Sequence, residues 1–317
     1  MDIQIDIGDM HMKRRPPRLH KGDTVGIIAP SSPPNIERLT QSLVFLEQLG
    51  LHYVLGNTVQ LHNHYLAGTD KERAEDLQEM IEDPNIKAIF CASAGFGAAR
   101  IADQIDYLSI EENPKIFWGF SDITFLHTAI GMYADIVTFH GPTLSSIGRD
   151  DVTERTKHMF EQLFQPAEIH YDESISPLTT FCSGVARGEI TGGNLTLIAN
   201  SLGTKFEINT AGKILLMEDI GLEPAQIDAI LNQLKQARKF EQVKGIVIGD
   251  FAEIHPREYE DSPHLEELFE FYFKDLNIPV VSGFKIGHCE PNVGIPLGVD
   301  VILDAVNKDL AILPGVE

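Results

Sequence analysis

The sequence has few cysteines and no long hydrophobic run, and these two absences exclude several classes of protein. Its three cysteines, Cys91, Cys182 and Cys289, form no C-x-x-C pair and are too few for a disulfide framework, so a reducing compartment fits best. No apolar stretch approaches the ~18 residues of a membrane-spanning helix, and no hydrophobic signal segment opens the chain. We therefore expect a cytoplasmic protein.

Basic residues are scarce as well. The 317 residues include 25 Lys and Arg against 47 Asp and Glu, which gives a formal net charge of −22. Because nucleic acids and anionic membranes attract basic surfaces, neither is expected as the main partner. A hydrophobic content of 43% and a charged content of 23% are ordinary for a globular protein, so a disordered or fibrous chain is excluded.

Strand and helix patterns alternate in the first half of the chain. Residues 1–11 resemble an added leader and residues 12–20 an N-terminal extension, so the pattern begins at Lys21. Such alternation, with right-handed crossovers, predicts an α/β domain with a doubly wound parallel sheet over residues 21–165. Ligands of such sheets bind at the carboxyl ends of the strands. Strands are predicted at 25–29, 52–55, 87–92, 115–120 and 136–139, and helices at 36–49, 71–82, 98–108 and 122–133.

The alternation stops at residues 166–187, where proline, glycine and serine interrupt any periodic pattern. We expect a linker there and a smaller, β-rich mixed α/β domain over residues 188–317. The length of the chain agrees with about two domains. In this second domain, helices are predicted at 194–201 and 224–240 and strands at 213–217, 245–248, 280–283 and within 299–313.

The most informative stretch is residues 115–124, where an apolar strand ends at Gly-Phe-Ser-Asp and a helix begins at once. On such a sharp turn the oxygen of Ser121 is exposed beside the free N–H groups of the helix N-terminus, which is where an activated nucleophile belongs. Serine is also a preferred helix cap, and the motif differs from the G-x-S-x-G of α/β-hydrolases, so both interpretations stay open. A nucleophilic serine needs a histidine and an orienting acid elsewhere.

Candidates for that histidine and that acid lie in the second half of the chain. His288 follows a strand within a Gly/Pro-rich loop, where binding residues concentrate, although a plain loop histidine is the alternative. Glu218 and Asp219 end an apolar strand. Because successive strand side chains point to opposite faces, only one of the two acids can face a cleft, and the spacing does not choose between them.

A small-residue loop, Gly95-Phe96-Gly97, follows another strand. It fails the dinucleotide-binding pattern because Arg100 stands where the third glycine belongs. Its backbone N–H groups suit an oxyanion hole, and ordinary turn glycines are the alternative. Among the other histidines, His62 and His64 have no third metal ligand at a suitable spacing, so we expect them in a surface loop. His127 and His140 fall in or beside predicted core elements, so we expect them to have structural roles.

Taken together, these segments resemble the LD-carboxypeptidase family of serine peptidases, which includes murein tetrapeptide carboxypeptidases and microcin-immunity hydrolases. The resemblance implies that Ser121 is the nucleophile, His288 the base and Glu218 the acid, with the backbone N–H groups of Gly95 and Asp122 as the oxyanion hole. The sequence around these motifs is most similar to that of Bacillus-type members of the muropeptide-recycling branch. Matching motifs run through residues 22–25, 29–31, 95–97, 118–122, 192–195, 216–219 and 287–288.

The resemblance also implies an activity. The family hydrolyses the L,D amide bond that releases terminal D-alanine from murein tetrapeptides, with no metal or cofactor, and commonly forms homodimers. Many relatives carry arginine where this chain has Ser93, which leaves open what binds the substrate carboxylates; Arg100 and Lys285 are the nearest cations in sequence, and Asn194 is a candidate substrate contact. The alternatives are hydrolysis of a peptidyl-adenylate antibiotic, as in the immunity branch, and a non-catalytic two-lobed binder.

Overall fold

The strands of the first half form a six-stranded sheet in the computed structural model, which describes residues 12–255 and 261–317. The leader predicted at residues 1–11 lies outside the described residues. Five strands are parallel, and the sixth, β12, comes from late in the chain and runs antiparallel to β5. The order is β12-β5-β4-β3-β1-β2, with β1 at Thr24–Ile28, β2 at His52–Leu55, β3 at Ile86–Cys91, β4 at Ile116–Gly119, β5 at Thr138–His140 and β12 at Ile295–Leu297.

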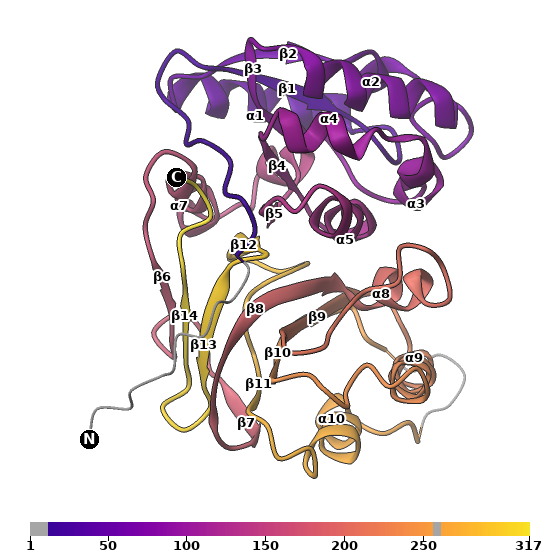
Figure 1. Ribbon diagram of the computed structural model, residues 1–317, viewed down its shortest axis with the longest axis vertical. Coiled ribbons are helices and arrows are strands. Elements are labelled where there is room, and N and C mark those ends of the chain that lie inside the picture. Colours follow the sequence, from indigo (N-terminus) through magenta and orange to yellow (C-terminus); the bar gives the residue numbers. More distant parts are fainter. Residues whose placement is uncertain (1–11, 256–260) are drawn as a thin grey trace.

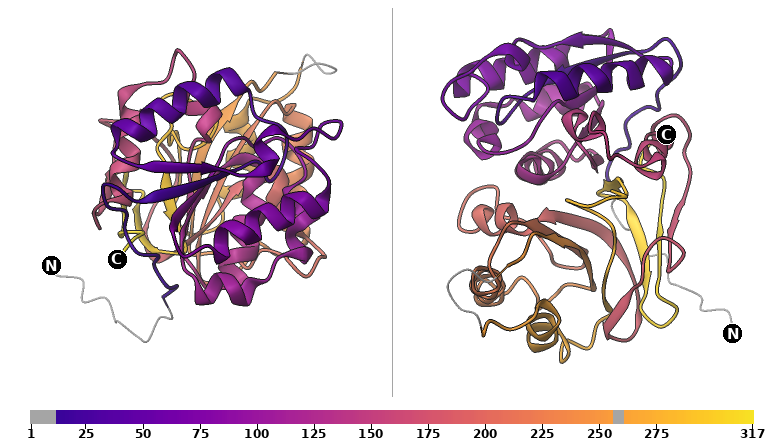
Figure 2. Two further views of the ribbon diagram at one scale, coloured as in Figure 1. Left: turned by 90° about the horizontal axis from the view of Figure 1, so that it is seen from above. Right: turned by 180° about the vertical axis from the view of Figure 1, so that it is seen from behind.

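Helices cover both faces of this sheet, as the predicted doubly wound fold requires (Figure 2). Since neighbouring strand residues point to opposite faces, Ile27 and Phe90 pack in one apolar core with Leu39 of α1, whereas Ile28 and Ile89 pack in the other with Leu77 of α2. The helices are α1 Ile36–Gln48, α2 Asp70–Glu82, α3 Ala98–Ile101, α4 Tyr107–Glu112, α5 Thr124–Tyr133, α6 Leu144–Ile147 and α7 Glu154–His158, with 3₁₀ turns η1 Asn57–Gln60, η2 Ala102–Gln104, η3 Ser121–Ile123 and η4 Met159–Leu163.

The single helix predicted at residues 98–108 is wrong, because the structure divides this segment into α3, η2 and the start of α4. Asp106 causes the second break. Its side chain accepts hydrogen bonds from the backbone N–H groups of Leu108 and Ser109, which makes it the N-cap of a new helix. Elsewhere in this domain the predicted elements are present with ends shifted by one or two residues.

The second domain is built on an eight-stranded mixed sheet of order β6-β14-β13-β8-β9-β10-β11-β7. The segment that we interpreted as a linker, residues 166–187, contributes β6, β7 and the start of β8 to this sheet. The elements are β6 Ile169–Tyr171, β7 Thr179–Cys182, β8 Val185–Asn194, α8 Leu195–Ser201, β9 Ile214–Ile220, α9 Pro224–Gln236, β10 Gly245–Ala252, α10 Leu265–Phe273, β11 Val280–Ser282, β13 Asp300–Asp304 and β14 Asp309–Ile312.

The two domains are stacked, with α5 on the side of the first domain that faces the second (Figure 1). Helix α5 contacts β8 and α8, and β12 reaches back from the second half of the chain to complete the first sheet. The start of α5 and the ends of β8 and β9 are therefore brought to one interface. Among the described helices, none has the length and apolar character needed to cross a membrane.

Candidate active site

Ser121 occupies a strained turn between β4 and α5. Phe120 is extended, with φ −151°, and Ser121 then takes a left-handed φ of +62°, a conformation that costs a non-glycine residue roughly 1–3 kcal/mol. Ser121 is not the cap of the helix, since Phe120 holds that position and no side chain caps the turn. The Ser121 hydroxyl instead lies 3.0 Å from Nε2 of His288. The helix-cap interpretation is therefore excluded.

His288 links this hydroxyl to Glu218. Its Nδ1 lies 2.7 Å from Oε2 of Glu218, and the Glu218 side chain is fully buried on β9. Gly287 permits this approach, because it has a φ of +123° and a Cβ there would lie 2.4 Å from Oε2 of Glu218. Three side chains from two domains thus form one hydrogen-bonded line, with each ring nitrogen of His288 engaged.

The electrostatics of the pair suit a histidine base. Burial alone would lower the pKa of His288, but the adjacent Glu218 carboxylate outweighs it, so the pKa is raised above its usual value. Burial raises the pKa of Glu218, and His288 opposes that rise. Each group stabilises the charged form of the other, which is what a base needs when it takes a proton during catalysis.

The neighbouring acid, Asp219, has a different task. Its carboxylate accepts hydrogen bonds from Nδ2 of Asn194, from the N–H and hydroxyl of Thr196, and from the N–H of Ile220. Asp219 points to the other side of β9 and anchors the start of α8. The structure thereby makes the choice between Glu218 and Asp219 that spacing left open.

Asn194, our candidate substrate contact, uses both ends of its side chain inside the protein. Its Oδ1 accepts from the N–H of Leu197 as the N-cap of α8, and its Nδ2 donates to Asp219. The residue is only 3% exposed. These contacts favour a positioning role, and direct contact with substrate stays a prediction.

Phe120 and Asp122, which flank the serine, support the site in ways that the sequence did not predict. The Phe120 ring lies 4.6 Å from the His288 ring, centroid to centroid, and packs against it. The buried Asp122 carboxylate accepts from the Ser31 hydroxyl at 2.6 Å and from the N–H of Ala98 at 2.7 Å. Burial raises the pKa of Asp122, against the effect of these donors. Asp122 therefore ties the serine turn to the end of β1 and to the loop that carries Gly95.

The loop before α3 presents the N–H of Gly95, for which the described residues supply no acceptor. Ser32 braces this loop, since its N–H donates to the carbonyl of Ala94 and its hydroxyl accepts from the N–H of Phe96. Ser93 donates to the carbonyl of Ser32 at 2.5 Å, so in this chain it is part of the same brace. The N–H group of Gly95 and the N–H group of Asp122, which stands at the start of a helical turn, are donors of the kind that an oxyanion hole requires.

Replacing Gly95 with alanine should lower kcat about 10²- to 10³-fold, the cost of losing one oxyanion donor. Gly95 has a φ of +115°, and a Cβ there would lie 2.5 Å from the Ser32 hydroxyl, so the loop must move. Gly22→Ala is the matched control, because Gly22 has a φ of +93° with no atom within 4 Å of its Cβ position. Steady-state kinetics of both variants measure the effect, and equal kcat values would exclude the proposed donor.

The loop that carries His288 is anchored by Glu290, another residue that the sequence did not single out. Its Oε2 accepts from the N–H and hydroxyl of Thr153 and from the hydroxyl of Thr156, at the start of α7. The Thr156 hydroxyl also accepts from the N–H of Asn292. These bonds fix the loop just after the histidine, and the only sequence signal for them is the closeness of Glu290 to His288.

The two cations nearest to the site in sequence already have acidic partners. Arg100 pairs with Asp70 at 2.8 Å, and Lys285 with Asp250 at 2.7 Å. His62 and His64 are exposed, as predicted for a surface loop. Within residues 12–255 and 261–317, no group of three His, Cys, Asp or Glu side chains is arranged to hold a metal.

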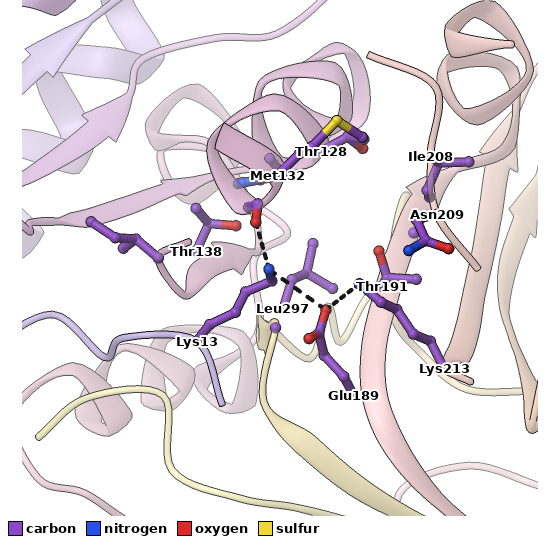
Figure 3. A pocket seen from close by; sticks show the side chains of 15 residues that line it. Lys13, Thr128, Met132, Thr138, Glu189, Thr191, Ile208, Asn209, Lys213 and Leu297 are labelled. Atoms are coloured by element: carbon purple, nitrogen blue, oxygen red, sulfur yellow. Dashed lines mark hydrogen bonds and ion pairs between the residues drawn. The ribbon is translucent and has the colours of Figure 1, made fainter. Parts of the chain in front are cut away.

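A separate cavity of about 200 Å³ lies at the C-terminal end of α5 (Figure 3). Glu189 pairs there with Lys213 at 2.7 Å and lies 3.9 Å from Lys13, whose ammonium also donates to the carbonyl of Gly131. None of Ser121, Glu218 and His288 lines this cavity. It is therefore distinct from the hydrogen-bonded line described above.

Comparisons with known proteins identify the family of the chain. A model of the LD-carboxypeptidase N-terminal domain matches residues 25–141, and a model of the LD-carboxypeptidase C-terminal domain matches residues 187–303. The chain belongs to the LD-carboxypeptidase family. The family expected from the motifs is confirmed, and so is its two-domain α/β fold.

Relatives within the family cover nearly the whole chain. It is 49% identical over 310 residues to the "Probable murein peptide carboxypeptidase" of Bacillus subtilis, a match covering 98% of this chain and 97% of the relative. It is 29% identical to the "Murein tetrapeptide carboxypeptidase" of Pseudomonas aeruginosa, covering 88% and 92%. A solved structure of MccF in complex with glutamyl sulfamoyl guanosine superposes with a TM-score of 0.86 at 27% identity, covering 94% of this chain and 98% of that one.

Proposed function

We propose that this protein is a serine LD-carboxypeptidase that releases the terminal D-alanine of murein tetrapeptides during recycling of cell-wall peptides. The observation that carries the proposal is the hydrogen-bonded line from Ser121 through His288 to Glu218, at 3.0 and 2.7 Å. The relative from Bacillus subtilis, whose printed name is a murein peptide carboxypeptidase, supports the substrate class. Several relatives are named as carboxypeptidases, and these three side chains supply a nucleophile, a base and an orienting acid.

The geometry suggests the order of events. His288 takes the proton of Ser121 as its oxygen attacks the carbonyl between the third residue and D-alanine. The N–H groups of Gly95 and Asp122 stabilise the oxyanion, and Glu218 stabilises the imidazolium. His288 then protonates the amine of D-alanine, which leaves. Water attacks the acyl-enzyme with His288 as base, and the tripeptide is released.

Activity should fall as the pH falls through the pKa of His288. Only neutral His288 accepts the serine proton, and its pKa is raised by Glu218, so the acid limb of kcat/KM should lie above about pH 6.5. Rates of D-alanine release across pH, from protein checked to be folded, measure this limb. Activity that stays level down to about pH 5 would contradict the role of His288 as base.

The decisive experiment uses defined tetrapeptides and mass spectrometry. Peptides of the form L-Ala-γ-D-Glu-X-D-Ala, with diaminopimelate, its amidated form or lysine at X, should each be tested for the loss of one alanine. A matched peptide ending in L-alanine serves as the control, because the proposal requires an L,D bond. Intact peptides after incubation with folded protein would reject the proposed substrate class.

Hydrolysis of a peptidyl-adenylate antibiotic is the second candidate, because MccF superposes on this chain. Stacking on a nucleobase requires an exposed aromatic face. The single tryptophan of this chain, Trp118, is fully buried against Phe160 and cannot stack on a base, whereas Phe96, next to Gly95, and Tyr65 are exposed aromatic residues. Incubation with both substrate classes separates the two proposals.

We also propose that the protein is a cytoplasmic homodimer. Family resemblance supports the dimer, and the low cysteine content supports a reducing compartment. Analytical ultracentrifugation of the purified protein tests the dimer, and a monomer at micromolar concentration would refute it.

A further inference from the structure

A buried histidine beside the proposed triad has no partner for either ring nitrogen. His140 ends β5 and is fully buried, and among the described residues neither Nδ1 nor Nε2 forms a hydrogen bond. Its Nε2 lies 3.9 Å from Oε1 of Glu218, which is equally buried and unpartnered. A buried polar atom without a hydrogen bond destabilises the folded protein, so two such atoms facing each other need an explanation.

Two groups besides His288 are placed to act on the Glu218 carboxylate: the Asn194 side chain, which lowers the pKa of Glu218, and His140, whose Nε2 faces Oε1. The other carboxylate oxygen of Glu218 is taken by His288, and the adjacent Asp219 points to its own donors around α8. The ring centroid of His127, on α5, lies 6.3 Å from that of His140, and Nε2 of His127 is paired with the carbonyl of Gly119. No carboxylate other than Glu218 is within ion-pair distance of His140 in the described parts of the chain.

These neighbours keep His140 uncharged. Burial lowers its pKa well below the usual value, and the nearby His127 and His288 lower it further. Asp250 on β10 raises the pKa of His288. A neutral imidazole is a dipole, and with its proton on Nε2 the positive end of that dipole faces Oε1 of Glu218.

We infer that His140 is a positioning residue whose Nε2–H is directed at Oε1 of Glu218 and holds that carboxylate ionised and aligned with His288. The inference rests on the proposed function, because it assigns a role within the same catalytic line. His140 does not touch the substrate, since it is fully buried. It acts through Glu218, and Phe120, whose ring lies 6.1 Å from that of His140 and 4.6 Å from that of His288, packs against both.

This role has a kinetic signature. In the active state, ionised Glu218 with neutral His288 carries one negative charge, whereas the protonated pair is neutral overall. The Nε2–H dipole therefore stabilises the active state more than the protonated one. Without it, His288 gains its proton at higher pH, so the acid limb of activity moves upward and kcat falls while KM stays unchanged.

The test compares three substitutions in the full-length protein. His140→Phe keeps a ring but removes both nitrogens, His140→Gln places an amide N–H near the position of Nε2, and His140→Asn places one near Nδ1. We expect His140→Phe to lower kcat roughly 10- to 100-fold, as loss of an orienting partner commonly does, and to raise the acid limb. His140→Gln should recover most of the rate, and His140→Asn should not.

Two readouts keep this test separate from that of the proposed function. One is D-alanine release from the tetrapeptide, and the other is the rate at which a serine-directed fluorophosphonate labels Ser121, which needs no knowledge of the substrate. A wild-type protein that is labelled but does not cleave the peptide refutes the substrate class and leaves His140 testable by labelling.

The inference itself is overturned if folded His140→Phe protein keeps the wild-type kcat, labelling rate and acid limb. It is also overturned if His140→Gln is no better than His140→Asn, a comparison that stands even where His140→Phe does not fold. Thermal melting of each variant establishes which of them are folded.

Discussion

Ser121→Ala should abolish turnover, lowering kcat by about 10⁶ while leaving the protein folded. Within the described part of the chain, the Ser121 hydroxyl has one hydrogen-bond partner, Nε2 of His288, so its removal should cost little stability but removes the proposed nucleophile. Alanine retains the left-handed turn at φ +62° without adding bulk. D-Alanine release and a thermal melt of the same preparation measure the two effects together.

A double variant tests whether Ser121 works as a unit with His288. His288→Ala alone should cost about as much as Ser121→Ala, and combining the two should cost little more, because either change disables the same proton transfer. Losses that multiply would mean that the two side chains act independently. Near wild-type release of D-alanine by folded Ser121→Ala protein would end the serine-peptidase proposal.

Glu218→Gln should lower kcat by about 10⁴, with little change in KM. The carboxylate accepts the Nδ1–H of His288 and so keeps the lone pair of Nε2 directed at Ser121. An amide in the same place can donate to Nδ1 instead, which stabilises the tautomer whose Nε2 carries the proton and cannot act as a base. The negative charge that raises the pKa of His288 is lost at the same time.

Glu189→Gln is the matched control for this substitution. Glu189 is a largely buried acid of the same domain, paired with Lys213 and remote from the triad. The same exchange of carboxylate for amide should there leave kcat within a few-fold of wild type. Comparable losses in both variants would show that Glu218→Gln acts through general damage to the domain.

The first domain shows how much of the fold can be predicted from local sequence patterns. Apolar runs and helical faces predict its parallel sheet and its three longest helices, α1, α2 and α5, because each of those elements buries residues at a regular spacing in its own sequence. The helix predicted at residues 98–108 is wrong, because Asp106 bonds to local N–H groups and overrides the apolar spacing, and the short helices α6 and α7 were not predicted.

The candidate active site likewise has one part that the local sequence predicts and one part that it does not. The strand-to-helix turn at Ser121 is a local feature that ten consecutive residues predict. The choice of Glu218 over Asp219 rested on resemblance until the structure showed which acid faces His288 and which one faces α8. Neither the alternation of strand side chains nor spacing can say which face of a strand will meet another domain.

The sequence by itself therefore determined the α/β class, the family and the strand-to-helix turn at Ser121, since these depend on residues that are neighbours in the chain. Tertiary structure alone decided the line of contacts, because His288 stands 167 residues from Ser121 and 70 from Glu218. It also decided the contacts of Asp122 and Glu290, and the position of His140 beside Glu218, because these neighbours lie on other elements. Such pairings follow from how two domains pack, and no local pattern of the chain encodes them.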